Sequence, residues 1–262
     1  MRSSIRVCFL LAFLALLSKA DVVVVTPANL GNWTVTESDA SVVSSFVTGP
    51  GTAPRGTGSV QFQIGADGDQ YIILRNDKDI AGTSVSALTQ LSYSTYQQQY
   101  VSGQAVYLSL LLSNNDKLYF EPVYQTGGYS GDTVPNQCSG SPNCAALNQW
   151  QTWNALLGGW WGYNMSTNDN LYGSNGGPPV FTLAHYATDH PTVTIDAIRL
   201  LAGGGAGAWD NFRGNADDLT FATATGSKTF DFESAAVPEP TSLILLVGML
   251  GCVGMLRSRM KC

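Results

Sequence analysis

A cluster of tryptophans is the strongest chemical signal in this chain. Four of the six tryptophans lie between positions 150 and 161, and Tyr163 follows them. An indole face packs well against the apolar C–H face of a pyranose ring, so exposed tryptophans in such a cluster predict sugar binding. We therefore expect Trp153, Trp160, Trp161 and Tyr163 to bind a ligand. In an extended segment residues 160 and 161 face opposite ways, as do 150 and 153, so at most half can line one surface. Packing in the core is the alternative.

Aspartates near the end of the central region form a second pattern. Asp217 and Asp218 precede a short apolar run, and Asp231 lies within the next one. A hard cation such as Ca²⁺ is held by several carboxylate and carbonyl oxygens. We therefore expect a structural Ca²⁺ at Asp217, Asp218 and Asp231, with solvated acidic turns as the alternative.

Catalytic patterns are sparse. A glycoside hydrolase usually needs two carboxyl groups at a set separation. Glu121 follows the apolar run at 118–120, but no second carboxylate accompanies it in a recognisable pattern. His185 and His190 are spaced by five, which suits neither one face of a strand nor one face of a helix, so a metal pair is not expected there. No nucleophile elbow and no phosphate-binding glycine loop of the Walker type occurs.

The elements that must position these residues have the spacing of strands. Apolar or alternating runs recur between turns rich in Gly and Pro, and residues 192–200 alternate polar and apolar side chains throughout. The runs lie at 22–26, 41–47, 59–64, 71–74, 88–96, 105–112, 118–124, 192–200, 218–221 and 229–232. No amphipathic helix of three turns is predicted between 21 and 236, although 153–157 suits a single turn. The pattern favours an all-β fold, a β-sandwich of the double-sheet jelly-roll type.

The N-terminus has the three parts of a secretory signal peptide. Arg2 and Arg6 precede an apolar run at 7–17, which ends before Ser18-Lys19-Ala20. We expect residues 1–20 to be removed. The alternative is a membrane anchor, but the apolar run is about half of the ~20 residues that span a bilayer.

The C-terminal segment 235–262 carries the sequence Val237-Pro238-Glu239-Pro240, then sixteen uncharged residues at 241–256 and a basic tail at 257–262. This arrangement resembles the PEP-CTERM sorting signal of Gram-negative bacteria that make exopolysaccharide. The resemblance implies a short hydrophobic transmembrane helix at 241–256 and processing by an exosortase near the Pro-Glu-Pro motif. The protein would be tethered to the inner membrane before processing and would then lie in the cell envelope or outside the cell.

Export also explains the cysteines of the central region. Cys138 and Cys144 flank a Ser-Gly-Ser-Pro-Asn turn. In an oxidising compartment a local disulfide between them is expected. A metal site is not expected, because no second cysteine pair accompanies them.

The charge of the central region excludes one class of partner. Between positions 21 and 236 there are eighteen acidic and seven basic side chains, a net charge of −11. Binding to a phosphate backbone needs clustered Lys and Arg, so no nucleic-acid partner is expected.

A second resemblance covers most of residues 21–234. The opening Asn32-Trp33, the segment 150–154, the doublet Trp160-Trp161 and the closing runs 217–221 and 229–233 are similar to exported bacterial jelly-roll domains related to carbohydrate-binding modules. Such modules often hold a structural calcium through an acidic residue of the closing strand. The resemblance implies one domain at 21–234.

These observations favour a non-catalytic exported protein of the envelope or biofilm matrix, sorted by an exosortase and binding exopolysaccharide. The alternative is a secreted polysaccharide-acting enzyme, a glycoside hydrolase or lyase, built on the same sandwich. A surface protein without a ligand is a third reading, separated from the first by whether the tryptophan cluster is exposed.

Overall fold

The computed structural model describes residues 20–99, 103–139, 144–205 and 207–235. The predicted signal peptide, apart from Ala20, and the predicted sorting motif, hydrophobic helix and basic tail lie outside these ranges. Among the described residues no helix is both long enough and apolar enough to cross a membrane.

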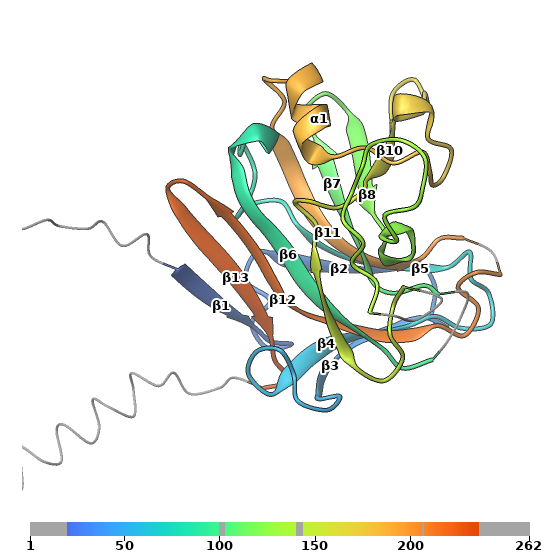
Figure 1. Ribbon diagram of the computed structural model, residues 1–262. Coiled ribbons are helices and arrows are strands. Elements are labelled where there is room, and N and C mark those ends of the chain that lie inside the picture. Colours follow the sequence, from blue (N-terminus) through green and yellow to red (C-terminus); the bar gives the residue numbers. More distant parts are fainter. Residues whose placement is uncertain (1–19, 100–102, 140–143, 206, 236–262) are drawn as a thin grey trace, which may run out of the picture.

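Two sheets make up the domain (Figure 1). The first has seven strands: β1 (Ala20–Val25), β3 (Val43–Thr48), β4 (Gly58–Gln63), β6 (Leu88–Gln97), β9 (Trp150–Asn154), β12 (Arg213–Thr223) and β13 (Gly226–Phe232). Its order is β1-β13-β12-β4-β3, and β6 joins β12 to β9. β1 and β13, which lie far apart in the sequence, pair in parallel, so the first and last strands of the domain are neighbours.

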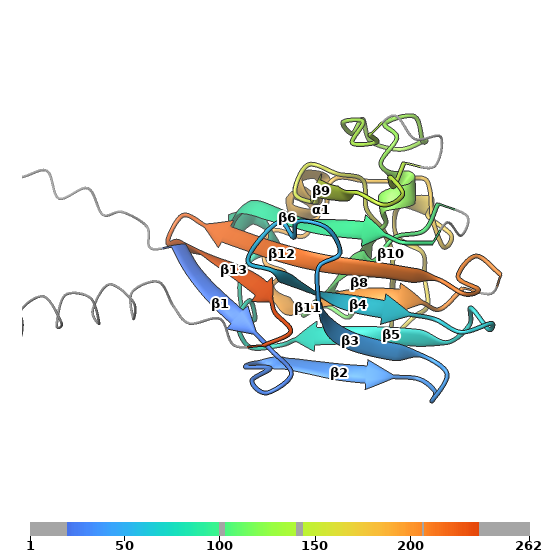
Figure 2. The ribbon, with the colours of Figure 1, turned by 90° about the horizontal axis from the view of Figure 1, so that it is seen from below.

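The second sheet has six strands in the order β10-β8-β7-β11-β5-β2. They are β2 (Trp33–Glu37), β5 (Tyr71–Asn76), β7 (Tyr107–Leu112), β8 (Asp116–Phe120), β10 (Trp161–Asn164) and β11 (Ile195–Gly203). All of the pairings in this sheet are antiparallel. Figure 2 shows the long strands of the domain running in layers.

Helical structure is confined to short connections. These are three 3₁₀ turns, η1 (Val85–Ala87), η2 (Pro122–Tyr124) and η3 (Leu171–Gly173), and the helix α1 (Leu183–Asp189). Thr182 caps α1 by accepting a hydrogen bond from the backbone N–H of His185 at 3.1 Å.

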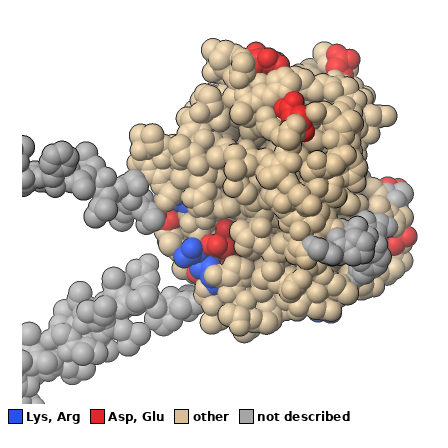
Figure 3. All heavy atoms as spheres, viewed as in Figure 1, with Lys and Arg blue, Asp and Glu red and all other residues tan. Residues whose placement is uncertain are grey.

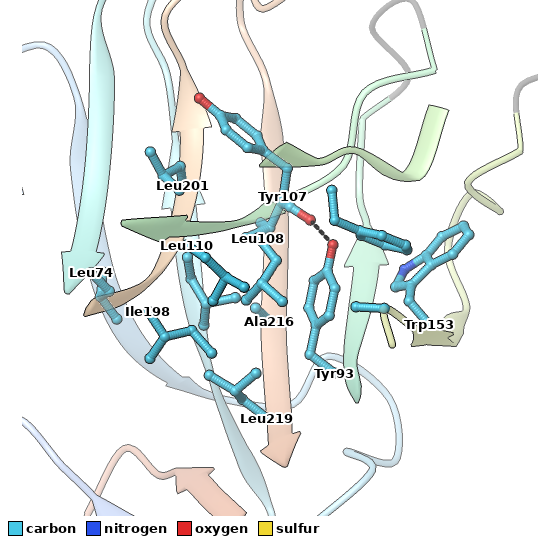
Figure 4. Close-up of a cluster of buried hydrophobic side chains, with 14 of the residues drawn as sticks. Leu74, Tyr93, Tyr107, Leu108, Leu110, Trp153, Ile198, Leu201, Ala216 and Leu219 are labelled. Atoms are coloured by element: carbon cyan, nitrogen blue, oxygen red, sulfur yellow. Dashed lines mark hydrogen bonds between the residues drawn. The ribbon is translucent and has the colours of Figure 1, made fainter. Parts of the chain in front are cut away.

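The core lies between the two sheets, since every second residue of each strand points inward. Figure 4 shows fully buried side chains from both sheets, among them Leu108, Leu110, Ile198, Tyr93, Ala216 and Leu219. The Tyr93 hydroxyl donates to the carbonyl of Val106 at 3.0 Å, so this polar atom is satisfied inside the core.

The predicted β-sandwich is confirmed, and each of the ten predicted runs contains all or part of a strand. Three strands were not predicted, at Trp33–Glu37, Trp150–Asn154 and Trp161–Asn164. The single helical turn suggested at 153–157 is wrong, because Trp153 lies in β9 and pairs with Tyr93 of β6. The helix α1 was also missed, since its seven residues are too few for a periodic pattern.

Candidate functional site

One row of side chains crosses the six-stranded sheet from edge to edge on the face turned away from the other sheet. The residues are opposite one another in the strand register, and they alternate with inward-facing core residues. We call them the cross-strand row: Trp161, Tyr119, Ser109, Arg199, Arg75 and Thr34. The row is aromatic at the β10 edge and basic toward the β2 edge.

The aromatic half is a stack of partly exposed rings. The rings of Tyr119 and Trp161 lie 4.4 Å apart between centroids with an interplanar angle of 20°. Tyr163 continues the stack, 6.3 Å from Tyr119. The Lys117 ammonium donates a hydrogen bond to the Tyr163 hydroxyl at 2.9 Å and lies 5.7 Å from the Tyr119 ring centroid. These contacts hold the rings in fixed positions, as a binding surface requires.

A pocket of about 300 Å³ adjoins this stack. Its walls come from β7, β8, β10, η2 and the loop after β11, and the side chains that line it include Gln104, Tyr107, Glu121, Tyr124, Trp161 and Trp209. Gly203, with φ of 88°, ends β11 and lets the backbone turn where a Cβ would meet the carbonyl of Gln70. An aromatic pocket with a few polar groups is the usual form of a small-molecule or sugar subsite.

Glu121 is the acidic residue among the described residues that line this pocket. The Trp161 indole N–H donates to its carboxyl oxygen Oε1 at 3.1 Å. Burial raises the pKa of Glu121 from 4.5 to about 7, and the hydrogen bond from Trp161 offsets part of that effect. This carboxyl group can therefore hold or release a proton near neutral pH.

Arg199 is the centre of the basic half. It is only 7% exposed, and its guanidinium donates to the Ser109 hydroxyl at 2.7 Å. Its Nε is buried, and the described residues offer it no hydrogen-bond partner. Arg75 lies directly opposite on β5, with the nearest carboxylate, that of Asp77, at 3.7 Å.

Two of the predicted ligand-binding residues are not at this surface. Trp153 and Trp160 are fully buried, and their indole N–H groups donate to Thr95 and to the carbonyl of Ala155, both at 2.8 Å. Figure 4 places Trp153 among the core side chains. A sugar-stacking role for these two tryptophans is therefore wrong. Trp161 and Tyr163 are partly exposed and lie together, as sugar binding requires.

The predicted calcium residues gather where β12 and β13 meet the loop at 55–57, but they have different partners. Asp218 forms an ion pair with Arg55 at 2.6 Å. Asp217 accepts hydrogen bonds from the backbone N–H groups of Arg55 and Phe232 at 3.1 and 3.0 Å. Within the described ranges no group of three or more His, Cys, Asp or Glu side chains is arranged to hold a metal ion.

One carboxylate of this group remains suited to a cation. Asp231 has a buried oxygen, Oδ1, for which the described residues offer no partner. Burial first, and then repulsion by Glu233, raise its pKa to about 6. A Cβ on Gly56 would clash with Glu233 and lie 3.0 Å from Asp231 Oδ1, so both carboxyl groups converge on this glycine. Asp231 and Glu233 are therefore the two carboxyl groups that lie together here, and Ca²⁺ binding at Asp217, Asp218 and Asp231 stays a prediction.

Two smaller expectations concern the loops. The disulfide between Cys138 and Cys144 is confirmed. The loop before it is attached to β9, because the Gln137 side chain accepts from the Asn154 N–H at 2.7 Å. The His185 ring atom Nδ1 forms a hydrogen bond with the Asp132 carboxyl oxygen Oδ2 at 2.9 Å, and His190 follows the end of α1. His185 thus lies within α1, and His190 is its C-terminal cap residue.

A larger hollow of about 720 Å³ lies over β6 and β9 of the other sheet. It is lined by hydroxyl and amide side chains and leucines, and the one aromatic residue among its described lining is the fully buried Trp153. We place the functional site on the six-stranded sheet, because exposed rings and charged groups occur together there.

Most of the cross-strand row does not follow from the sequence. Alternation predicts Arg199 only as one member of a strand, although a basic residue between Ile198 and Leu200 is itself unusual. Tyr119 belongs to an apolar run that predicts only a strand. The missing information was the register, since Tyr119 and Trp161 are 42 positions apart and become neighbours only through the β8–β10 pairing.

No protein-family model and no curated protein matches this chain. Among solved structures, a family 11 carbohydrate-binding module from Clostridium thermocellum, in complex with a β-1,3-1,4-mixed-linked tetrasaccharide, is 10% identical, with a TM-score of 0.36 over 78% of this chain and 91% of that one. A family 22 module from the same organism is 13% identical, with a TM-score of 0.35 over 76% and 90%. A β-1,2-glucanase from Parabacteroides distasonis is 9% identical, with a TM-score of 0.35 over 79% of this chain and 24% of that one. Each ligand or activity named here is that of the matched protein.

Proposed function

We propose that this chain is an exported, non-catalytic protein that binds a polysaccharide across the open face of its six-stranded sheet. The observation that carries the proposal is the cross-strand row. It places stacked aromatic rings beside hydroxyl and guanidinium groups, which are the two kinds of group that bind the apolar face and the hydroxyls of a sugar. The row follows the sheet across six strands, so it suits an extended chain better than a single sugar.

The test measures retention of the full chain on extracellular polysaccharide from a producing Gram-negative strain. Trp161→Ala and Tyr119→Ala should each weaken binding by ~0.5–1.5 kcal/mol beyond the lost area. Trp150→Ala is the matched control, since Trp150 is a partly buried tryptophan on the other sheet that packs against Tyr96. Equal losses in all three variants, or none, would contradict this location.

A polysaccharide-acting enzyme is the second candidate, favoured by one observation. Glu121 is a partly buried residue beside partly exposed aromatic rings, and the raised pKa of about 7 of its carboxyl group is what a general acid needs. A hydrolase of the usual kind also needs a second carboxylate, and the described lining of the pocket contains none. Reducing ends that appear with the wild type and vanish in Glu121→Gln would show that the enzyme class is correct.

The location of the protein is part of the same proposal. Residues 1–20 direct export, and the segment 235–262 hands the protein to an exosortase at the inner membrane. The mature protein then belongs to the envelope or the extracellular matrix, where the polysaccharide is found. The signal-peptide pattern and the Pro-Glu-Pro motif with its hydrophobic and basic segments support this location.

A further inference from the structure

The basic side chains of this acidic domain are unevenly distributed. Residues 21–236 contain seven Lys and Arg against eighteen Asp and Glu. Three of the seven, Arg75, Lys117 and Arg199, lie on the open face of the six-stranded sheet. On the side seen in Figure 3 most of the surface is uncharged, and the Lys and Arg side chains lie beside Asp and Glu. The proposed binding face therefore carries three of the seven basic side chains of a domain that is acidic as a whole, with Asp77 and Glu121 as acidic neighbours.

Arg199 and Lys117 differ in their partners from the ion-paired cations of the domain, to which Arg75 of this face also belongs, 3.7 Å from Asp77. Arg55 lies 2.6 Å from Asp218, and Lys228 lies 2.6 Å from Asp79. On the open face, Arg199 and Lys117 donate instead to the neutral hydroxyls of Ser109 and Tyr163. Among the described residues neither of these two cations has a carboxylate within 4.0 Å, the limit for an ion pair.

A buried cation without a counter-ion is unfavourable, because burial removes water that would otherwise solvate the charge. Arg199 is 7% exposed and its Nε has no partner among the described residues. A carboxylate supplied by a ligand would provide the missing acceptor, and a guanidinium matches a carboxylate in shape and hydrogen bonding.

The electrostatic effects of these cations are visible in a neighbouring side chain. Burial alone would raise the pKa of Tyr163, but its hydrogen bond with Lys117 and the charges of Lys117 and Arg199 outweigh burial and lower that pKa. Glu121, the acidic residue of the adjoining pocket, has a pKa raised by burial to about 7. At pH 7 its carboxyl group is therefore protonated in a fraction of the molecules. At Tyr163 the two cations therefore favour negative charge, whereas burial disfavours it at Glu121 and Tyr119.

We propose that the polysaccharide bound at this face is anionic, with Arg199 and Lys117 binding carboxylate groups of the sugar chain and Arg75 extending the basic region. This inference rests on the proposed function. Trp161 and Arg199 are three strands apart, about 14 Å at the usual spacing of ~4.8 Å, so these two side chains contact different sugars of one chain.

The experiment compares two polymers that differ only in charge. Polygalacturonate is one probe, and the same polymer with its carboxyl groups reduced to neutral hydroxymethyl groups is the other. The full chain should bind the charged polymer at least tenfold more tightly, and this preference should decrease as salt is added. Polyglutamate is included as an anion without sugar rings.

Two variants connect the preference to the residues. Arg199→Gln and Lys117→Gln should each weaken binding of polygalacturonate by roughly ten- to hundredfold, as expected for loss of a hydrogen bond between charged groups. Both should weaken binding of the neutral polymer much less, so the ratio between the two affinities should fall toward one. Arg213→Gln removes the same charge from β12 of the other sheet and is the matched control. Arg199→Lys keeps the charge and should lose less than Arg199→Gln, and an unfolding midpoint for each variant shows that it is folded.

The outcomes separate this inference from the function on which it rests. Equal binding of both polymers, lost in Trp161→Ala, would keep the glycan site and overturn its preference for anions. Polyglutamate bound as tightly as polygalacturonate would overturn recognition of a sugar chain. If the protein binds no polysaccharide, and Trp161→Ala changes no measured affinity, the proposed function itself is overturned.

Discussion

Trp153 and Trp161 are neighbours in one sequence cluster, but their surroundings in the fold give them different roles. Trp153 is fully buried between the sheets, whereas Trp161 is partly exposed and stacks on Tyr119. Trp153→Ala should lower the free energy of unfolding by ~3–5 kcal/mol, because it leaves a large cavity. Trp161→Ala should weaken polysaccharide binding with a smaller effect on stability. Denaturant unfolding and a binding assay on both variants are the measurements. An unchanged free energy of unfolding in Trp153→Ala would contradict the burial of Trp153.

The ionisation of Glu121 predicts how the stability of the protein depends on pH. Its pKa is raised from 4.5 to about 7 in the folded protein, so between these values the folded state holds a proton that the unfolded chain has lost. Stability should therefore fall as the pH rises through this range. Glu121→Gln cannot ionise and keeps an acceptor for the Trp161 N–H, so its free energy of unfolding should fall less steeply.

The comparison is made by denaturant unfolding in the presence of a chelator. Asp217 and Asp231 also have pKa values raised by burial, to about 8 and about 6, and they act in the same direction. The slope in Glu121→Gln should therefore be reduced and not abolished. Identical slopes for the variant and the wild type would show that Glu121 is ionised in the folded state.

At the scale of elements, the end of β13 is attached to the loop at 55–57 by carboxylates. Glu233 accepts from the Thr57 backbone N–H at 2.6 Å, and Asp217 accepts from the Arg55 N–H at 3.1 Å. Acidic side chains thus connect this loop to the sheet near the end of β13. The same arrangement brings the carboxyl groups of Asp231 and Glu233 together beside Gly56.

This junction is where a calcium ion would act. A cation that binds only the folded state adds ~2.7 kcal/mol at a hundred times its dissociation constant. The unfolding midpoint should therefore be several degrees higher with excess Ca²⁺ than with a chelator. Asp231→Asn should remove this difference, and Asp169→Asn, at an exposed loop aspartate, should keep it. Equal unfolding midpoints of the wild type with Ca²⁺ and with chelator would contradict Ca²⁺ binding.

At the scale of the whole molecule, the first and last strands of the domain connect it to the two segments that are predicted to direct export. β1 and β13 lie side by side, so the predicted signal peptide and sorting segment join the domain at neighbouring strands. Exosortase processing predicts that the exported protein lacks the basic tail 257–262. Mass spectrometry of the mature protein is the measurement. A C-terminus at Cys262, in exported material from cells that contain an exosortase, would contradict the sorting proposal.

Local patterns were sufficient to predict the sheet architecture. Alternation and glycine-rich turns gave strands within each of the ten runs, because one buried face imposes a period of two on each strand. The disulfide also followed from the sequence, since two thiols across a short turn in an exported chain have few other partners. The helix α1 was not predicted, because seven residues make only about two helical turns, and the four-residue strand β10 was not predicted either.

The tertiary structure decided which residues form the candidate site. Exposure of a tryptophan depends on what packs over it, so the sequence left Trp153, Trp160 and Trp161 equivalent, and the fold buried the first two. The cross-strand row depends on register between strands that are distant in the sequence. Pairing of β8 with β10, and of β7 with β11, brings Trp161, Tyr119, Ser109 and Arg199 into one line. No local propensity encodes that alignment, because register is set by how all the strands pack together.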